Sequence, residues 1–390
     1  MQLDVIIEQR FYCCSKKQYW TDNAFPNAFW VRYLTVFSAV NIVARVEHVA
    51  NPKSDWKRVD GDNVHFVDLP CYIGPFGFVK TFPSLYKKIR SRLGIERKVI
   101  YRIPGILSTL YQLFATTKSQ KYGAEVVGDP ADVFSVGASK SVFRGFFKWL
   151  FVKMLKAQCS GATSISYVTE YSLQQRYPPN PKAFHTHYSS IQLTQADYHQ
   201  RDTYNLSKEL KIICIGNLTQ PYKGCDFMLE SLAQLKELGV NCQLTWIGGG
   251  YLLAEMQQLV KGLGIDQQVN FVGNLSDRNE IRARLDQADV FVLSSRQEGL
   301  PRVLIESMAR SLVCVATNVG GVKELLSNDF IIEKDNQSQL VAQIQRLSGL
   351  AEQDLLTIAQ TNYQKSLDYQ DSVLTQRRES MFKHLLGERS

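Results

Sequence analysis

The second half of the chain alternates short apolar runs with longer segments in which apolar residues recur at helical spacing. The apolar runs are 211–216, 242–247, 269–272, 288–294, 312–317 and 330–332. The helical segments between them are 225–238, 252–263, 278–286, 301–310 and 338–347. Nearly continuous apolar strands that alternate with helices are typical of a parallel sheet covered by helices on both faces. The pattern therefore predicts a doubly wound α/β domain.

The first half of the chain shows the same alternation in a less regular form. Its apolar runs of strand type are 3–7, 40–46, 65–68, 99–102, 125–127 and 164–168. These runs predict a second α/β domain. The polar stretch 194–210 between the two patterns is the predicted linker, so we expect one domain over 1–205 and another over 206–365.

Composition agrees with a globular chain of two domains. The 390 residues are 45% hydrophobic and 21% charged, a balance typical of a protein that buries a core. The longest apolar run, 33–44, is shorter than the ~18 residues that a spanning helix needs, and the start lacks a positively charged leader before an apolar stretch. The eight cysteines are scattered without metal-ligand spacing, which indicates reduced thiols and no metal site. We therefore expect a cytoplasmic protein.

Positive charge is concentrated in the first half. Residues 1–200 contain 25 Lys and Arg against 14 Asp and Glu, whereas residues 201–390 contain 20 against 23. The excess is densest at 80–98 and 140–156, and aromatic residues lie between the basic residues of the second stretch. Such a mixture is typical of a helix at the surface of an anionic membrane; the alternative is a helix whose aromatic side chains enter the core beneath a solvated basic edge. No nucleic-acid recognition motif accompanies the charge, so nucleic acid is not an expected partner.

The most specific segment of the chain is 294–306, which follows an apolar run and leads into a helical pattern. In an open α/β sheet, ligands bind at the carboxyl ends of the strands, which is where Glu298 falls. Gly299 allows close approach of a backbone, and Pro301 suits the first position of a helix. Glu306 then lies in the second helical turn, so the two carboxylates can address one ligand, and the positive end of the helix favours a phosphate nearby.

This segment resembles the donor-site signature of retaining glycosyltransferase family four, in which seven residues separate two glutamates and Gly-Leu-Pro follows the first, as at Gly299, Leu300 and Pro301. The similarity extends through most of 211–350. Its other motifs are Ile215-Gly216-Asn217-Leu218, Lys223-Gly224, Ile247-Gly248-Gly249-Gly250, Val269-Asn270-Phe271-Val272-Gly273 and Asn318-Val319-Gly320-Gly321. The resemblance implies the GT-B fold, in which two Rossmann-like, doubly wound α/β domains face each other across a cleft. It implies an acceptor-side first domain, a donor-binding second domain and a last helix, about 366–390, that packs back on the first domain.

The resemblance also implies roles for individual residues. In the family the second glutamate, here Glu306, accepts hydrogen bonds from the ribose hydroxyls of the donor, and the first, here Glu298, lies near the donor sugar. Lys223 matches the lysine that neutralises the donor diphosphate, a task suited to an ammonium group. The loop that holds the base through backbone contacts corresponds to Asn274 and Leu275. Further donor contacts are implied at Gly216, Asn217, Gly248, Gly299, Leu300 and Pro301.

Two positions depart from the family pattern. Asn217 stands where the family usually has an arginine that shares the diphosphate with the lysine, so another cation such as Arg302 is needed, or phosphate binding is weaker. Asp129 stands near the place of a family histidine that faces the donor sugar. Asp129 is therefore a candidate catalytic residue beside Glu298, and the alternative is an ordinary Asp-Pro turn.

These observations predict a retaining glycosyltransferase of the hexosyltransferase type. Its expected co-substrate is a UDP- or GDP-sugar, with no permanently bound cofactor and no metal ion. The expected acceptor is a saccharide or a lipid-linked saccharide in bacterial surface polysaccharide synthesis. We also expect peripheral contact with the inner face of the cell membrane through 80–98 and 140–156.

Two other classes of protein remain as alternatives. The first is a non-catalytic nucleotide-sugar-binding protein or membrane-surface scaffold of the same fold. The second is a nicotinamide-dependent oxidoreductase, because Gly248-Gly249-Gly250 lies between a predicted strand and a predicted helix. Leu253 stands in place of the third glycine of that motif, and no acidic residue ends the next strand, so the oxidoreductase is disfavoured.

Overall fold

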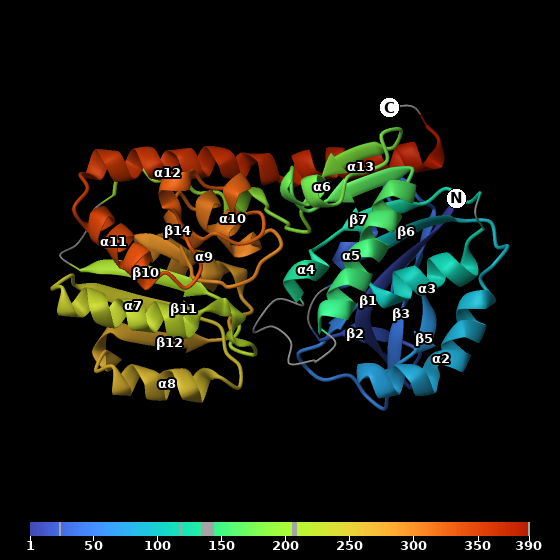
Figure 1. The fold of residues 1–390 in the computed structure, drawn as a ribbon, viewed down its shortest axis with the longest axis horizontal. Helices are drawn as coiled ribbons and strands as arrows, with labels where there is room; N and C mark the ends of the chain where they lie inside the picture. The colour runs from blue at the N-terminus through green and yellow to red at the C-terminus, as the bar shows by residue number, and fades with distance from the viewer. Residues whose placement is uncertain (23–24, 118, 134–143, 205–208, 389–390) are drawn as a thin grey trace. The chain divides into compact units, whose positions relative to one another are not determined.

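The computed structural model describes residues 1–22, 25–117, 119–133, 144–204 and 209–388. Contacts divide the chain into two compact units, Met1–Tyr188 with Thr375–Ser390 and Ser189–Leu374 (Figure 1). The domain boundary expected near residue 205 lies outside the described residues and stays a prediction. Among the described residues, no helix is both long enough and apolar enough to cross a membrane.

The described part of the first unit contains one sheet of nine strands. Its strands are β1 (Gln2–Cys14), β2 (Tyr19–Thr21), β3 (Ala39–Val49), β4 (Lys57–Arg58), β5 (Val64–Pro70), β6 (Lys98–Ile103), β7 (Gly123–Val126), β8 (Ser164–Tyr167) and β9 (Phe184–His187). β3 and β5 extend the sheet from one side of β1, and β6 to β9 extend it from the other, all in parallel. The short strands β2 and β4 are antiparallel additions at the end of β1. Each of the six predicted runs overlaps one strand, whereas β2, β4 and β9 were not predicted.

The helices of the first unit include one from the far end of the chain. They are α1 (Asn27–Val31), α2 (Gly74–Arg90), α3 (Ile106–Ala115), α4 (Pro130–Val133), α5 (Arg144–Gly161), α6 (Ser172–Arg176) and α13 (Asp371–Leu386). On α13, Phe382 stacks on Tyr33 with 5.0 Å between ring centroids. The Ser164 hydroxyl of β8 donates a 2.8 Å hydrogen bond to the carbonyl of Met381. The last helix therefore completes the core of the first unit.

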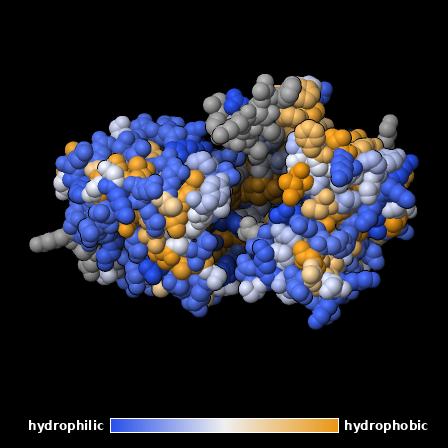
Figure 2. All heavy atoms as spheres, turned by 90° about the horizontal axis from the view of Figure 1, so that it is seen from below, coloured by the Kyte–Doolittle hydropathy of each residue, from blue (hydrophilic) through white to orange (hydrophobic). Residues whose placement is uncertain are grey.

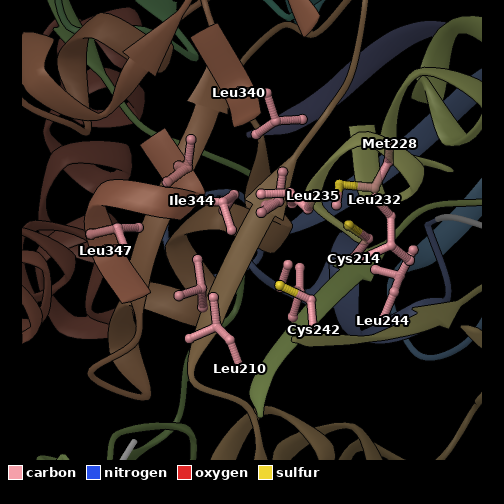
Figure 3. Close-up of a cluster of buried hydrophobic side chains, with 14 of the residues drawn as sticks. Leu210, Cys214, Met228, Leu232, Leu235, Cys242, Leu244, Leu340, Ile344 and Leu347 are labelled. Carbon is pink, nitrogen blue, oxygen red and sulfur yellow. The ribbon is translucent and has the colours of Figure 1, made fainter. Parts of the chain in front are cut away.

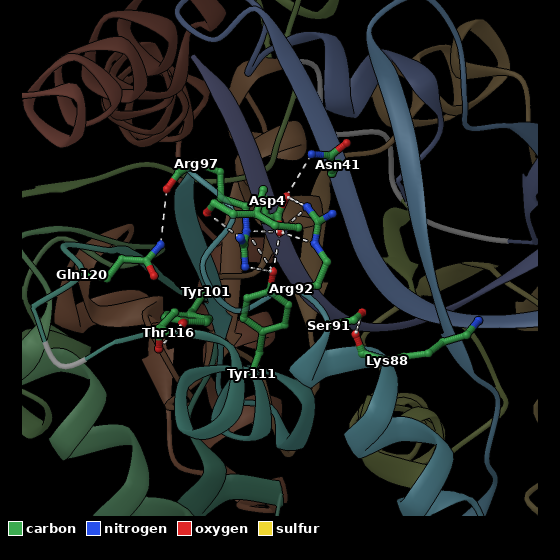
Figure 4. A network of polar contacts seen from close by, with 11 residues as sticks. Asp4, Asn41, Lys88, Ser91, Arg92, Arg97, Tyr101, Tyr111, Thr116 and Gln120 are labelled. Carbon is green, nitrogen blue, oxygen red and sulfur yellow. Dashed lines mark hydrogen bonds and ion pairs between the residues drawn. The ribbon is translucent and has the colours of Figure 1, made fainter.

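A buried carboxylate near the start of the chain organises part of the first unit (Figure 4). Asp4 is fully buried in β1 and forms ion pairs with Arg92, at 2.8 Å, and with Arg97, at 2.6 Å. Asn41 of β3 donates a 2.9 Å hydrogen bond to Asp4, and the Tyr111 hydroxyl of α3 also donates to it. Burial and the charge of Asp4 raise the pKa of Tyr111 above its ordinary value, which keeps the phenol protonated as a donor. Arg97 is therefore buried and Arg92 half-buried, and both are neutralised by Asp4, although they belong to the basic stretch 80–98.

The described part of the second unit contains a parallel sheet of six strands in the order β12-β11-β10-β13-β14-β15. Its strands are β10 (Leu210–Ile215), β11 (Cys242–Ile247), β12 (Val269–Gly273), β13 (Val290–Leu293), β14 (Val313–Thr317) and β15 (Ile331–Ile332). The helices that accompany them are α7 (Cys225–Glu237), α8 (Leu253–Gly262), α9 (Arg278–Gln287), α10 (Arg302–Ala309), α11 (Gln337–Ser348) and α12 (Glu352–Ser366). All six predicted apolar runs contain these strands or overlap them, so the predicted doubly wound α/β fold is confirmed.

Helical spacing of apolar residues explains how α7 and α11 cover one face of this sheet. Met228, Leu232 and Leu235 repeat at intervals of four and three residues on α7 and are fully buried. Leu340, Ile344 and Leu347 repeat in the same way on α11. Both sets meet the strand residues Leu210, Cys214, Cys242 and Leu244 in one cluster (Figure 3). Burial of each large side chain contributes about 1.5–3 kcal/mol, so this layer holds the strand ends in fixed positions.

Candidate functional site

The order of the strands in the second unit reverses its direction of winding between β10 and β13. The chain leaves β10 toward β11 and β12 on one side, and it returns on the other side through β13, β14 and β15. Ligands of open α/β sheets bind at the carboxyl ends of the strands where the direction of winding changes. Lys223 follows β10 and Glu298 follows β13, so both lie at this point.

Lys223 and Glu298 are in direct contact. The Lys223 ammonium lies 2.7 Å from Oε1 of Glu298, and their side chains are 15% and 13% exposed. The Ser295 hydroxyl donates a 2.7 Å hydrogen bond to the same carboxylate oxygen. A charged hydrogen bond that is partly removed from water is stronger than one on an open surface, yet its ammonium can change partner when an anion arrives. The pair thus places one ammonium and one carboxylate together where β10 and β13 end.

Two glycines let the loops around this pair touch through their backbones. Gly224 has φ of +67°, and a Cβ there would lie 2.0 Å from the carbonyl oxygen of Ser294. Gly248 has φ of +133°, and a Cβ there would lie 2.1 Å from the carbonyl oxygen of Gly216. Any larger residue would push these loops apart, because the atoms in the way belong to the backbone. Gly216 in turn lies against the aliphatic part of Lys223, so three of the predicted donor-site residues, Lys223, Gly216 and Gly248, come together with Glu298.

The remaining predicted loop residues have local partners. The Asn274 side-chain oxygen accepts a 2.7 Å hydrogen bond from the backbone of Gly249, which ties the loop after β12 to the loop after β11. Leu275 follows it in that loop and is half-buried. The Asn217 side-chain oxygen accepts a 2.7 Å hydrogen bond from the Thr219 hydroxyl, so it closes its own turn.

The segment before α10 differs slightly from its prediction. Pro301 caps the helix and Arg302 is the first helical residue, whereas the sequence predicted Pro301 at that position. Leu300 is buried, and the carbonyl of Gly299 accepts a 2.7 Å hydrogen bond from the backbone of Gly321 after β14. The loop with Glu298 is therefore anchored on both sides.

Glu306 lines a different hollow from Lys223. Its neighbours around a small cavity of about 80 Å³ are Leu193, Asp197, Arg278, Ile281, Arg282, Leu285 and Arg310. Lys223 lines a larger cavity of about 460 Å³ beside α7 and α8. Burial raises the pKa of Glu306, against the opposing charges of Arg302 and Arg278 and with that of Asp197. The expectation that Glu298 and Glu306 address one ligand stays a prediction.

Asp129 lies in the first unit and is 7% exposed. Its carboxylate accepts hydrogen bonds from the backbone of Ala131, at 2.7 Å, from the Tyr177 hydroxyl, and from Arg176, at 2.6 Å. These contacts bind the turn before α4 to α6. They favour the structural alternative, because both carboxylate oxygens already have donors.

Arg296 is a site residue that the sequence analysis missed. Its guanidinium makes a bidentate pair with Asp226, at 2.8 and 2.9 Å, and contacts Asp335 at 2.7 Å. It also donates a 2.8 Å hydrogen bond to the carbonyl of Pro221, and its backbone donates to the carbonyl of Tyr222. Arg296 thus ties the turn that carries Lys223 to the loop that carries Glu298. Its partners are 39 to 75 residues away in sequence, so no local pattern marks it.

Residues 209–349 match the family model described as "Glycosyl transferases group 1". The chain is 24% identical to Protein CapJ of Staphylococcus aureus over 322 residues, which are 83% of this chain and 80% of that protein. It is 25% identical over 286 residues, 72% of this chain and 74% of the relative, to the N-acetylgalactosamine-N,N'-diacetylbacillosaminyl-diphospho-undecaprenol 4-alpha-N-acetylgalactosaminyltransferase of Campylobacter jejuni. Among solved structures, Anabaena Alr3699/HepE in complex with UDP and glucose is similar, with a TM-score of 0.64 and 12% identity over 98% of this chain and 99% of that one. Such likeness shows the fold, which is GT-B.

Proposed function

We propose that the chain, whose residues 209–349 match the family model of group 1 glycosyl transferases, moves a sugar from a nucleoside-diphosphate sugar to an acceptor hydroxyl with retention of anomeric configuration. The observation that carries the proposal is the half-buried pair of Lys223 and Glu298 that follows β10 and β13, where the direction of winding of the sheet changes. In this proposal no metal ion and no permanently bound cofactor takes part.

Lys223 would supply the main electrostatic stabilisation of the transition state. Negative charge grows on the diphosphate as the glycosidic bond breaks, and a fixed ammonium in a partly dry site stabilises that charge. Glu298 holds the ammonium while the site is empty and then faces the sugar once the diphosphate has taken its place. Asn217 carries no charge and already bonds to Thr219, so in the loop after β10 the cation that would meet the diphosphate is Lys223.

The nucleoside would lie along the ends of β11, β12 and α10. Glu306 would accept hydrogen bonds from the ribose hydroxyls, and the backbone at Asn274 and Leu275 would hold the base. The donor would approach the loops closely at Gly216, Gly248, Gly299, Leu300 and Pro301. A UDP-sugar or a GDP-sugar fits this arrangement, and the similar Anabaena protein was solved with UDP and glucose.

The acceptor would be a saccharide or a lipid-linked saccharide of bacterial surface polysaccharide synthesis. The name of the Campylobacter relative specifies an undecaprenol-linked acceptor, which supports this choice. An enzyme with such an acceptor works at the inner face of the cell membrane, and the basic stretches 80–98 and 140–156 supply charge for that contact. Of these, Lys140 lies outside the described residues, and Arg92 and Arg97 are paired with Asp4.

Thermal unfolding with UDP, GDP, ADP, CMP and NAD tests the donor site. A ligand that binds only the native state at about 100 times its Kd stabilises that state by about 2.7 kcal/mol, which raises the midpoint by several degrees. We expect this rise with UDP or GDP, and we expect Lys223→Met to abolish it.

Lys261→Met is the matched control, because Lys261 is an exposed lysine of α8 in the same unit. It should keep the full rise. A higher unfolding midpoint with NAD alone would overturn the proposal. An unchanged midpoint with every nucleotide would favour the non-catalytic scaffold. Once the nucleotide is known, NMR of the product formed from the matching sugar donor tests retention.

A further inference from the structure

One arginine in the core of the first unit lacks a compensating partner. Arg378 of α13 is 4% exposed, and its Nε and Nη2 atoms are buried without a hydrogen-bond partner among the described residues. Its Nη1 atom donates one long hydrogen bond, of 3.5 Å, to the Thr375 hydroxyl. Hydrophilic residues form much of the face of each unit that Figure 2 shows, and arginines ordinarily lie on such a surface. A guanidinium buried without a counter-charge is costly, so Arg378 needs an explanation.

Arg378 lies beside a buried network around Glu125. Its Cζ atom is 5.7 Å from the centre of the Tyr188 ring, and the Tyr188 hydroxyl donates a 2.9 Å hydrogen bond to Glu125. The Tyr33 hydroxyl also donates to Glu125, at 2.9 Å, and Arg102 forms an ion pair with it. The charge of Glu125 is therefore already used by Arg102.

A third arginine reaches the same region from the end of α1. Arg32 is half-buried and donates a 2.7 Å hydrogen bond to the carbonyl of Phe29. Its Cζ atom lies 3.7 Å from the centre of the Phe29 ring, and that of Arg102 lies 5.0 Å from the same ring. Burial and the positive charges of Arg378 and Arg102 lower the pKa of Arg32 to about 10. Three guanidinium groups thus surround the carboxylate of Glu125, which leaves an excess of two positive charges.

This cluster lies at the carboxyl ends of strands in the first sheet. Arg102 and Glu125 each occupy the position before the last residue of β6 and β7, and Tyr188 directly follows β9. The winding of this sheet changes direction between β1 and β6, because β3 and β5 extend it on one side and β6 to β9 on the other. Open α/β sheets bind ligands at the carboxyl ends of strands at such a point. The cluster therefore stands where this fold can receive a ligand.

The unpaired nitrogens of Arg378 indicate the kind of ligand. Nε and Nη2 lie on one edge of a guanidinium, where their N–H groups can bind two oxygens of one carboxylate or phosphate. A chloride ion or a water molecule offers only one acceptor atom to this edge. A phosphate group carries a charge of about −1.5 to −2 at pH 7, which matches the excess of two positive charges better than a carboxylate does. Geometry and charge together favour a phosphate group.

We propose that Arg32, Arg102 and Arg378 bind a phosphate group, either as inorganic phosphate or as part of a phosphate ester, in the first unit. Two of its oxygens would accept hydrogen bonds from Arg378, and it would enter beside Arg32, which is partly exposed. Its charge would neutralise the space between α1, β6 and α13 and so hold the last helix in place. The proposal goes beyond the proposed function and is independent of it, because Lys223 belongs to the second unit.

Isothermal titration of the full chain with potassium phosphate, in a chloride buffer of constant ionic strength, tests this site. We expect the wild type to bind phosphate and Arg378→Met to bind it at least about tenfold more weakly, because the bidentate contact is lost. Arg32→Met should weaken binding to a smaller extent, since this side chain is more exposed. Titration with glycerol 3-phosphate identifies the source: tighter binding than that of phosphate indicates an ester, and weaker binding indicates the free ion.

Thermal unfolding shows whether Arg378→Met is folded. Without phosphate its midpoint should equal or exceed that of the wild type, because an uncompensated buried charge has been removed. Saturating phosphate should raise the midpoint of the wild type by several degrees and leave that of Arg378→Met unchanged. A variant that unfolds at a lower temperature without phosphate would show that Arg378 is already compensated and would contradict the proposal.

Lys383→Met is the matched control, because Lys383 is an exposed residue of α13 that pairs with Glu379 at 3.8 Å. It should bind phosphate like the wild type. Equal affinity in Arg378→Met and the wild type would overturn the proposal, as would the absence of binding of both phosphate compounds. Loss of phosphate binding in Lys223→Met would also overturn it, since the phosphate would then occupy the donor site. Arg378→Met and Arg32→Met should keep the nucleotide-dependent rise in unfolding temperature, so failure here is distinct from failure of the proposed function.

Discussion

The cluster around Asp4 and the pair of Lys223 and Glu298 use opposite charges in two different ways. Asp4 lies inside a strand, is fully buried and has two arginines, a tyrosine and an asparagine as donors. Lys223 and Glu298 lie on loops at the ends of strands, are partly exposed and hold each other with a serine. The first arrangement is closed to ligands and stabilises the unit. The second retains access to solvent, so its charges can exchange partners.

The largest effect that we expect comes from breaking the closed cluster. Asp4→Ala leaves Arg97, whose side chain is 1% exposed, without its carboxylate, so the free energy of unfolding should fall by about 3–5 kcal/mol. Urea unfolding measures this loss. Glu47→Ala removes a carboxylate from an exposed pair with Arg10 in the same unit and should cost less than about 1 kcal/mol. Equal losses in the two variants would contradict the distinction between closed and open pairs.

A second effect separates nucleotide binding from sugar transfer at the solvent-accessible pair of Lys223 and Glu298. Glu298→Gln removes the negative charge that competes for Lys223, so affinity for the nucleoside diphosphate should rise by about two- to fivefold. Sugar transfer should fall by about 100-fold, because the carboxylate that faces the sugar is lost. Calorimetric titration and a transfer assay give the two values. A loss of nucleotide affinity as severe as in Lys223→Met would show that the carboxylate binds the donor rather than the lysine.

A smaller effect concerns Arg296, which positions the open pair without touching the proposed donor. Arg296→Met releases the turn of Lys223, so nucleotide affinity should fall by about tenfold, which is about 1.4 kcal/mol. Arg296→Lys should restore little, since lysine cannot form the bidentate pair with Asp226. Arg284→Met is the control, because Arg284 forms an exposed pair with Glu280 on α9. Isothermal titration with the nucleotide found by thermal unfolding measures all three, and full affinity in Arg296→Met would rule out positioning.

The smallest effect is a dependence of stability on pH. Burial raises the pKa of Glu306 in the folded state above its ordinary value of 4.5. The folded state then binds more protons than the unfolded state in that window, so the free energy of unfolding falls as pH rises from 4.5 through the folded pKa. Glu306→Gln lacks this titration. Subtracting its unfolding free energy from that of the wild type should give a difference that declines over this window, whereas a difference that is constant with pH would contradict the raised pKa.

Local pattern was sufficient for most of the fold. Apolar runs located every strand of the second sheet, because strands buried on both faces must be apolar throughout. β2, β4 and β9 escaped prediction, since strands of two to four residues with polar or half-buried side chains carry no such signal. Glu298 was found from its place at the carboxyl end of a predicted strand, whereas Lys223 was found through motif resemblance.

The sequence by itself determined the two α/β patterns, the excess of charge in the first half and the residue types at the strand ends. These follow from local rules, because burial of a strand or a helix face sets a period along the chain. Only the tertiary structure decided which charged side chains are exposed and which are paired in the interior. Arg97 and Lys80 are both basic residues of the stretch 80–98. Arg97 is buried in an ion pair with Asp4, which lies 93 residues before it, whereas Lys80 is exposed. This difference arises from packing between distant segments. The carboxylate that neutralises a buried arginine lies far away in the sequence, so the residues next to the arginine do not reveal that it is buried.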